Sequence, residues 1–251
     1  LSPVEVTALR LLVAGALVGV VARVAGNRVA LPACEWARLV PIGITAALHF
    51  LAFIASLYFT TVAHALTLTY TAPLFIAALS FLVLGEPLPR RTVPAAAALV
   101  GVAVLAGFEP QLNRRMLLGD ALALGAAVTF AAYSLLGRRE RARLPLLPYA
   151  AGVYLVAGLV TAPFAGSLLR PGLPLHALGA VCAMALVPSA LGHTLYNASI
   201  RRLHPSIPNL IATQEVTLGV LLAWILLGEP ITWSAAAGAA LTLLGVSVVL
   251  R

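Results

Sequence analysis

The residue most able to carry chemistry is Glu215, which lies near the middle of a long apolar segment at about residues 204–227. An ionised carboxylate at the centre of a bilayer is costly unless it is paired or hydrated. We therefore interpret Glu215 as a protonatable group, or as the partner of a substrate amine, in a central cavity. The alternative is a structural carboxyl that bonds a neighbouring hydroxyl or backbone carbonyl.

Two histidines, His49 and His193, each lie near the middle of another apolar segment. His193, Tyr196 and Asn197 are three and four residues apart, so they share one face of a helix. A polar stripe inside lipid predicts that this face lines a cavity, and hydrogen bonding between helices is the alternative. The same reasoning makes three further side chains candidates for lining a substrate site: Tyr70, Thr71 and Tyr133.

The residue spacing also excludes several kinds of site. No histidine and carboxylate have metal-ligand spacing, so we expect neither a metal nor a cofactor. Without a Walker motif or a glycine-rich phosphate loop, this chain cannot itself drive transport with ATP. An intramembrane enzyme needs two catalytic groups on facing helices, and His49 with Glu215 is the pair that fits. Beside a transporter and an intramembrane enzyme, a non-transporting membrane scaffold is the third class of function that we consider.

The composition indicates that the surroundings are a lipid bilayer. The 251 residues are 61% hydrophobic and only 10% charged, whereas a soluble domain carries roughly 25% charged residues. This leaves too little polar surface for a soluble enzyme. The net charge of +8 would suit a nucleic-acid binder, but the arginines form short clusters between apolar segments. We therefore predict an integral membrane protein with no nucleic-acid partner.

Nine apolar segments are long enough to cross a membrane as helices, so the predicted fold class is an all-α polytopic membrane protein. They cover about residues 4–24, 36–60, 64–84, 92–108, 117–137, 146–166, 176–199, 204–227 and 231–250.

The arginines predict the orientation of these segments. If Leu1 lies outside, twelve of the 16 arginines fall on the cytoplasmic side and three fall on the other side. The positive-inside rule then places the C-terminus in the cytoplasm. The remaining arginine, Arg10, lies inside the first segment, where it either snorkels to the outer interface or gates the outer mouth.

Three acidic residues at segment ends have predicted structural roles. Glu86 and Glu229 each follow a glycine and precede a proline, which is typical of a helix end. Asp120 opens a segment, and its charge suits a helix N-terminus.

Two short sequences recur at a single offset of 143 residues. The sequence LVAG occurs at residues 12–15 and again at 155–158, while LGEP occurs at 84–87 and again at 227–230. Because both pairs share one offset, we predict an internal repeat.

The repeat divides the chain into residues 1–112 and 113–251. The second repeat holds five of the apolar segments and the first holds four, so we expect one further helix before Leu1. An odd number of helices per repeat gives the two halves opposite orientations. Such an inverted repeat is typical of secondary transporters, whose substrate site lies near the midplane between the halves.

Several short motifs carry a resemblance to a known family. They are the stretch from Leu1 to Arg10, Thr71-Ala72-Pro73 with Leu84-Gly85-Glu86, Gly119 to Leu124, Val187-Pro188-Ser189-Ala190-Leu191 with Tyr196-Asn197, and Gln214-Glu215-Val216 with Leu227-Gly228-Glu229. Together they resemble the EamA family of ten-helix carriers in the drug/metabolite transporter superfamily. That family often has a proline after the glutamate, where this chain has Val216, and Pro73 occupies the equivalent place in the first repeat.

The resemblance implies a multi-pass carrier in the plasma (inner) membrane. Its expected substrates are small metabolites such as amino acids, exported by alternating access with protons as a candidate coupling ion. A phosphorylated substrate is disfavoured, since no arginine lies at mid-span to clamp phosphate. The alternative within transport is a cationic-drug exporter that uses Glu215 as its charge partner.

Overall fold

The structure is a computed structural model of the chain, and it describes residues 1–27, 31–85, 113–166, 173–204 and 206–228, with residues 230, 231, 233, 236, 237, 240 and 241. The predicted segment 92–108 lies outside the described residues, as does most of 231–250. Glu86, Glu229 and the C-terminal residue Arg251 also lie outside them. The number of nine segments therefore stays a prediction.

The described residues contain seven helices that are long and apolar enough to cross a membrane. Each coincides, to within a few residues, with one of the predicted segments, so the all-α polytopic fold is confirmed. The seven are Pro3–Val24 (α1), Ala33–Ser56 (α2), Val62–Val83, Arg114–Arg141 (α6), Leu146–Phe164, Leu175–Ser199 and Ile207–Leu227.

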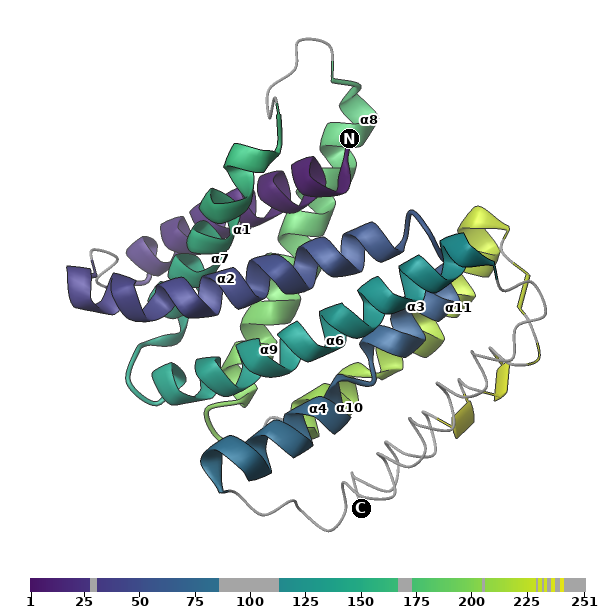
Figure 1. The fold of residues 1–251 in the computed structure, drawn as a ribbon. Coiled ribbons are helices and arrows are strands. Elements are labelled where there is room, and N and C mark those ends of the chain that lie inside the picture. The colour runs from purple at the N-terminus through teal and green to yellow at the C-terminus, as the bar shows by residue number, and fades with distance from the viewer. Residues whose placement is uncertain are drawn as a thin grey trace. The chain divides into compact units, whose positions relative to one another are not determined.

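Four of these membrane helices consist of shorter elements (Figure 1). These elements are α3 (Val62–Thr69), α4 (Ala72–Leu79) and the π-helix η1 (Ser80–Leu84); α7 (Leu146–Thr161) and the 3₁₀-helix η2 (Ala162–Phe164); α8 (Leu175–Met184), the π-helix η3 (Ala185–His193) and α9 (Thr194–Ser199); and α10 (Ser206–Ala212) with α11 (Gln214–Leu227).

Local sequence signals set where several helices begin and end. Ser2 caps α1 by accepting a hydrogen bond from the backbone N–H of Glu5, whose side chain bonds back to the N–H of Ser2. Gly85 and Gly228 end η1 and α11 with φ angles of 64° and 68°, a left-handed conformation that favours glycine. These two glycines are related by the offset of 143 residues.

The chain forms two compact units. Unit 1 comprises Leu1–Ile54 and Ala132–Arg202, and unit 2 comprises Ala55–Ala131 and Leu203–Arg251. Each unit therefore combines segments from both predicted repeats. Sequence repeats and compact packing units do not have to coincide. The repeat boundaries at residues 1–112 and 113–251 therefore stay a prediction.

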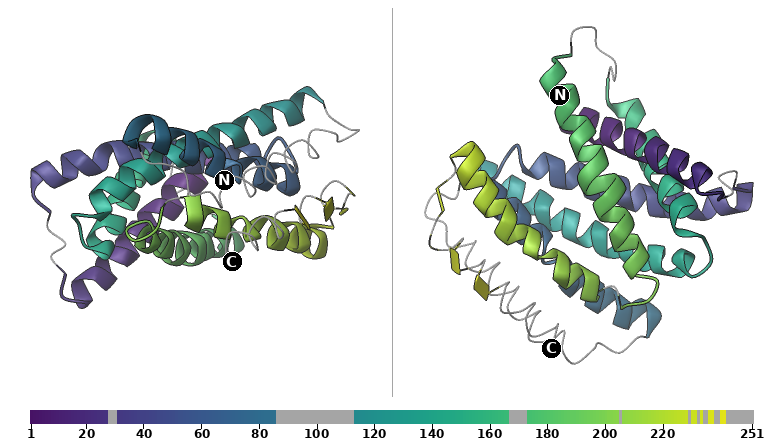
Figure 2. Two further views of the ribbon diagram at one scale, coloured as in Figure 1. Left: turned by 90° about the horizontal axis from the view of Figure 1, so that it is seen from below. Right: turned by 180° about the vertical axis from the view of Figure 1, so that it is seen from behind.

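In unit 1, α1 and α7 lie side by side at very close range (Figure 1 and Figure 2). A Cβ placed on Gly15 would lie 2.9 Å from the backbone nitrogen of Leu155, and one on Gly158 would lie 2.9 Å from that of Leu12. A later residue of α1 thus faces an earlier residue of α7, so the two helices run antiparallel. Small residues permit this approach where no hydrophobic effect drives helices together.

This crossing joins the two copies of the LVAG sequence. The glycine that ends each copy faces the leucine that begins the other, which is a reciprocal contact of the kind that a two-fold axis generates. Antiparallel packing of repeat-related helices is what an inverted repeat requires of this pair.

In unit 2, two membrane helices are interrupted at repeat-related places. The first is interrupted at Tyr70 and Thr71, just before Pro73, and the second at Thr213. The offset of 143 relates Tyr70 to Thr213. The second interruption occurs although Val216 occupies the place that is equivalent to Pro73. Helix α3 packs beside α11, and α4 packs beside α10 (Figure 1 and Figure 2).

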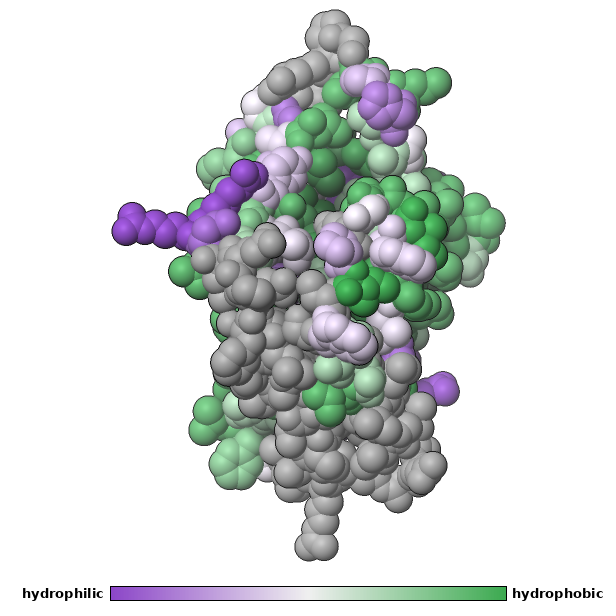
Figure 3. Space-filling view, turned by 90° about the vertical axis from the view of Figure 1, so that its right-hand side faces the viewer, coloured by the Kyte–Doolittle hydropathy of each residue, from purple (hydrophilic) through white to green (hydrophobic). Residues whose placement is uncertain are grey.

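Large apolar side chains cover much of the described surface. Figure 3 shows hydrophobic residues over one face, with few strongly hydrophilic ones among the residues that are coloured. On α11 the exposed apolar side chains include Leu218, Leu222 and Ile225. Lipid chains are as apolar as leucine, so such a surface suits a membrane helix.

Candidate functional site

In unit 2, Glu215 meets Tyr70 where the two interrupted helices cross. Glu215 lies in the first turn of α11, and Tyr70 follows the last residue of α3. The Tyr70 hydroxyl donates a hydrogen bond to the Glu215 carboxylate. The side chain of Glu215 remains exposed, whereas Tyr70 is half-buried. We name this arrangement the Tyr70–Glu215 crossing.

Further polar groups lie on the helices that form this crossing. The Thr71 hydroxyl is buried and donates to the backbone oxygen of Leu68 at 2.6 Å, which stabilises the end of α3. Among the residues that the structure describes, Asn209 Oδ1 and Gln214 Nε2 are buried and have no hydrogen-bond partner. Most buried polar atoms in proteins are hydrogen-bonded. The helices of the crossing thus carry buried polar groups, among them these two and Thr217 Oγ1, that can serve water or a ligand.

In unit 1, a hydrogen-bond network joins three other predicted site residues. The Tyr133 hydroxyl donates to Asn197 Oδ1 at 2.8 Å, and the Tyr196 and Ser134 hydroxyls lie 2.8 Å apart. Asn197 is 0% exposed, and its amide also donates to the Tyr154 hydroxyl. These bonds join α6 to α9 and α9 to α7. They are hydrogen bonds between helices, which was the alternative to cavity lining for the polar stripe. A role in lining a substrate site stays a prediction.

The two histidines that the sequence analysis singled out also lie close together in unit 1. The rings of His49 and His193 have centroids 6.2 Å apart, and the Phe50 ring stands edge-on to His193 at 4.7 Å. The offset of 143 relates Phe50, rather than His49, to His193. Repeat-related positions are therefore in contact here, as they are at the α1–α7 crossing.

Arg10 does not snorkel to the membrane interface. Its side chain is buried in unit 1, where Nε and Nη2 donate to Ser189 Oγ at 3.1 and 2.8 Å. The guanidinium also lies over the Phe50 ring, with its carbon 4.7 Å from the ring centroid. The snorkelling alternative is therefore wrong, because these inward contacts hold the side chain inside the unit.

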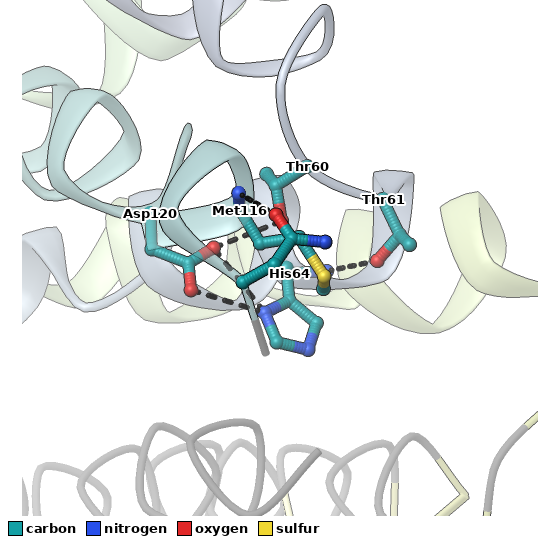
Figure 4. A network of polar contacts seen from close by, with 6 residues as sticks. Thr60, Thr61, His64, Met116 and Asp120 are labelled. Atoms are coloured by element: carbon teal, nitrogen blue, oxygen red, sulfur yellow. Dashed lines mark hydrogen bonds and ion pairs between the residues drawn. The ribbon is translucent and has the colours of Figure 1, made fainter. Parts of the chain in front are cut away.

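A second acidic site, in unit 2, was not predicted from the sequence. The Asp120 carboxylate accepts a hydrogen bond from the Thr60 hydroxyl at 2.9 Å and lies 3.2 Å from His64 Nδ1 (Figure 4). Helix α6 begins at Arg114, so Asp120 lies beyond its first turn, and the expected helix N-terminal role is wrong. No local signal links Asp120 to His64, because 56 residues separate them.

Comparisons with known proteins agree with this architecture. The family model described as the EamA-like transporter family matches residues 1–107 and 117–251. A protein of known crystal structure, described only as "protein", aligns with 99% of this chain and 88% of its own length, with a TM-score of 0.76. The identity is 24%, so that likeness concerns the fold alone. A search of curated proteins found no match.

Proposed function

Because the chain belongs to the EamA-like transporter family, we propose that it is a secondary carrier that exports small metabolites, amino acids or related compounds, by alternating access. The observation that carries this proposal is the Tyr70–Glu215 crossing. Transporters with inverted repeats bind their substrates where interrupted helices meet, because the interruption frees backbone and side-chain groups for a ligand. In unit 2 the two interruptions are related by the repeat offset, and Tyr70 at the first donates a hydrogen bond to Glu215, two residues after the second.

The chemistry of the crossing supports a substrate that carries an amine. A carboxylate attracts an ammonium group, and the attraction is stronger in a membrane interior than in water. Tyr70 fixes one oxygen of Glu215 by donating to it. The second oxygen of the carboxylate is then available to a substrate amine or to a proton. We propose that binding of the amine or the proton at Glu215 is coupled to the conformational change of alternating access.

The cationic-drug exporter is the alternative within transport. It uses the same carboxylate but needs no carboxyl group on the substrate. Membership of a transporter family argues against the intramembrane enzyme, for which His49 and Glu215 were the candidate pair. We propose the plasma (inner) membrane as the location, with the C-terminus in the cytoplasm.

Purified protein in proteoliposomes tests the proposal directly. Vesicles are loaded with labelled leucine, threonine or phenylalanine, and efflux is followed with and without an imposed pH gradient. We expect efflux of at least one amino acid above that of protein-free vesicles. Efflux of organic cations alone would favour the drug exporter, chemical conversion would favour the enzyme, and absence of any flux would favour the scaffold.

The substitution Glu215→Gln tests the site. It keeps the shape and the hydrogen bond from Tyr70 but removes the negative charge. We expect efflux to fall by about tenfold or more, which corresponds to about 1.4 kcal/mol, while the melting temperature in detergent stays near that of the wild type. Glu35→Gln is the matched control. It removes the same charge from the first turn of another helix, α2, which belongs to unit 1 and not to unit 2. Unchanged efflux with unchanged pH dependence in Glu215→Gln would show that Glu215 is structural.

A further inference from the structure

One side of α11 carries Glu215 among exposed apolar side chains. Leu218 and Leu222 follow Glu215 by three and seven residues, so they lie on the same side of the helix. They are 61% and 53% exposed, and Ile211, four residues before Glu215 in the last turn of α10, is 41% exposed. We name these four residues the Glu215 face. Another side of α11 is buried by three apolar residues: Val216, Val220 and Ala223.

A carboxylate at the depth of Glu215 does not suit a surface that faces lipid. The membrane helix Ile207–Leu227 extends eight residues before Glu215 and twelve residues after it, which is about 12 Å and about 18 Å along the helix axis. Acidic side chains this far inside a membrane are costly in hydrocarbon, and they face a bundle interior or a water-filled cavity. Leu218 lies within one turn of Glu215 on the same side, so it borders the same space.

The Glu215 face is complementary to one class of small molecule. Its carboxylate attracts an ammonium group, and hydrocarbon attached to that ammonium group leaves water when it packs against the exposed leucines. A polar group in the same place would lose its hydrogen bonds to water and gain none, because isoleucine and leucine side chains carry no polar atom. The face therefore suits an amine whose side chain is apolar.

We propose that the Glu215 face binds the apolar side chain of the transported amine, and that Ile211, Leu218 and Leu222 determine which side chains are accepted. Tyr70 holds the carboxylate through its hydrogen bond, so the ammonium group binds beside Glu215 and the attached hydrocarbon lies along the helix. This inference rests on the proposed function, since it requires that a small amine is carried. It narrows the substrates to amino acids and related amines with apolar side chains, so leucine and phenylalanine are preferred to threonine.

The test is a homologous series of competitors. Efflux of labelled leucine from wild-type proteoliposomes is measured with alanine, 2-aminobutyrate, norvaline or norleucine loaded beside the label, and successive competitors differ by one methylene group. Burial of each methylene favours binding, so we expect the half-inhibitory concentration to fall by about threefold to fourfold at each step. Threonine, which is 2-aminobutyrate with an added hydroxyl group, should compete less well than 2-aminobutyrate.

Two substitutions test the assigned residues. Leu218→Ala and Leu222→Ala each remove apolar surface beside the carboxylate, so we expect the advantage of norleucine over alanine to fall from about 30-fold to about tenfold or less. The control is Leu159→Ala, because Leu159 of α7 is also 61% exposed but belongs to unit 1. It should keep the wild-type advantage. Since all three leucines are exposed, each variant should melt in detergent near the wild-type temperature.

Two results would overturn this role of the Glu215 face: equal competition along the series in the wild type, or an unchanged advantage of norleucine in both Leu218→Ala and Leu222→Ala. Lipid or another part of the protein would then cover these side chains. Export of threonine without leucine would also overturn the role, yet it would leave the carrier function intact. Absence of all flux in the wild type would instead contradict the proposed function, so the two failures are distinguishable.

Discussion

Two acidic side chains of unit 2 illustrate how a carboxylate is accommodated in a membrane protein. Asp120 lies within a close cluster, in which its side chain is 15% exposed and that of His64 is 5% exposed. Glu215 accepts a hydrogen bond from Tyr70 and remains exposed. The enclosed carboxylate suits a structural role and the exposed one suits a ligand, because only the exposed one can exchange partners.

The structural role of Asp120 can be measured by a double-mutant cycle. We expect Asp120→Asn and His64→Gln each to lower the free energy of unfolding in detergent by about 1–3 kcal/mol, since each leaves a buried polar partner behind. The double variant should lose less than the two single losses combined, with a coupling of about 0.5–3 kcal/mol.

The control for this cycle pairs Asp120→Asn with His176→Gln. His176 is exposed in the first turn of α8, so these two losses should be additive. If the losses of Asp120→Asn and His64→Gln were additive as well, their contact would contribute nothing to stability.

At the scale of helical elements, α1 and α7 pack closely, because their glycines allow backbone to approach backbone. Interrupted helices and the two π-helices η1 and η3 occur elsewhere among the described residues. The π-helix η3 contains Pro188, which has no N–H to donate, and it presents Ser189 to Arg10. Irregular helices at functional places are common, since they free polar groups that a regular helix would use internally.

The α1–α7 crossing predicts a large difference between two glycine substitutions. In Gly15→Ala the new Cβ would lie 2.8 Å from Leu155 Cγ and 2.9 Å from its backbone nitrogen, so the helices must separate. We expect a loss of about 1–3 kcal/mol in the free energy of unfolding, as for overpacked cores. The melting temperature in detergent measures this loss.

Gly179→Ala is the control for this substitution, because nothing lies within 4 Å of a Cβ at that helical position. Alanine is the better helix former by about 1 kcal/mol, so the control should melt at or above the wild-type temperature. If both variants melted alike, the close crossing would not contribute to stability.

At the scale of the whole molecule, the chain is a multi-pass membrane protein of the EamA-like transporter family. Its arginines predict which ends of the helices face the cytoplasm, because the excess of basic residues on cytoplasmic links sets orientation during insertion. The link before α7 carries Arg143 and follows Arg138, Arg139 and Arg141. The link between α2 and α3, near Tyr58, carries no arginine. We therefore expect the link before α7 in the cytoplasm and the link near Tyr58 outside.

Cysteine labelling tests this orientation. Both native cysteines, Cys34 and Cys182, are exposed and must first be replaced. In that background we expect a membrane-impermeant maleimide, added outside intact cells, to label a cysteine at Tyr58 but not one at Ala142. Permeabilising the membrane should expose Ala142 to the reagent. Labelling of the Ala142 position in intact cells would reverse the orientation.

Features that depend on neighbouring residues along the chain could be predicted from the sequence. The seven described membrane helices follow from runs of apolar residues, since lipid cannot satisfy an exposed backbone. The cap at Ser2 and the left-handed glycines at 85 and 228 also follow from local signals. The offset of 143 residues predicted an internal repeat, because equivalent sequences adopt equivalent helices.

The contacts that define the candidate sites were decided only by the tertiary structure. Tyr70 and Glu215 are 145 residues apart, and Arg10 and Ser189 are 179 residues apart. A helical sequence indicates which residues share a face, but it does not indicate which helix that face meets. The inward direction of Arg10 and the pairing of Asp120 with His64 depend on that choice of neighbour, because a polar side chain in a membrane bonds whichever partner the packing brings within reach.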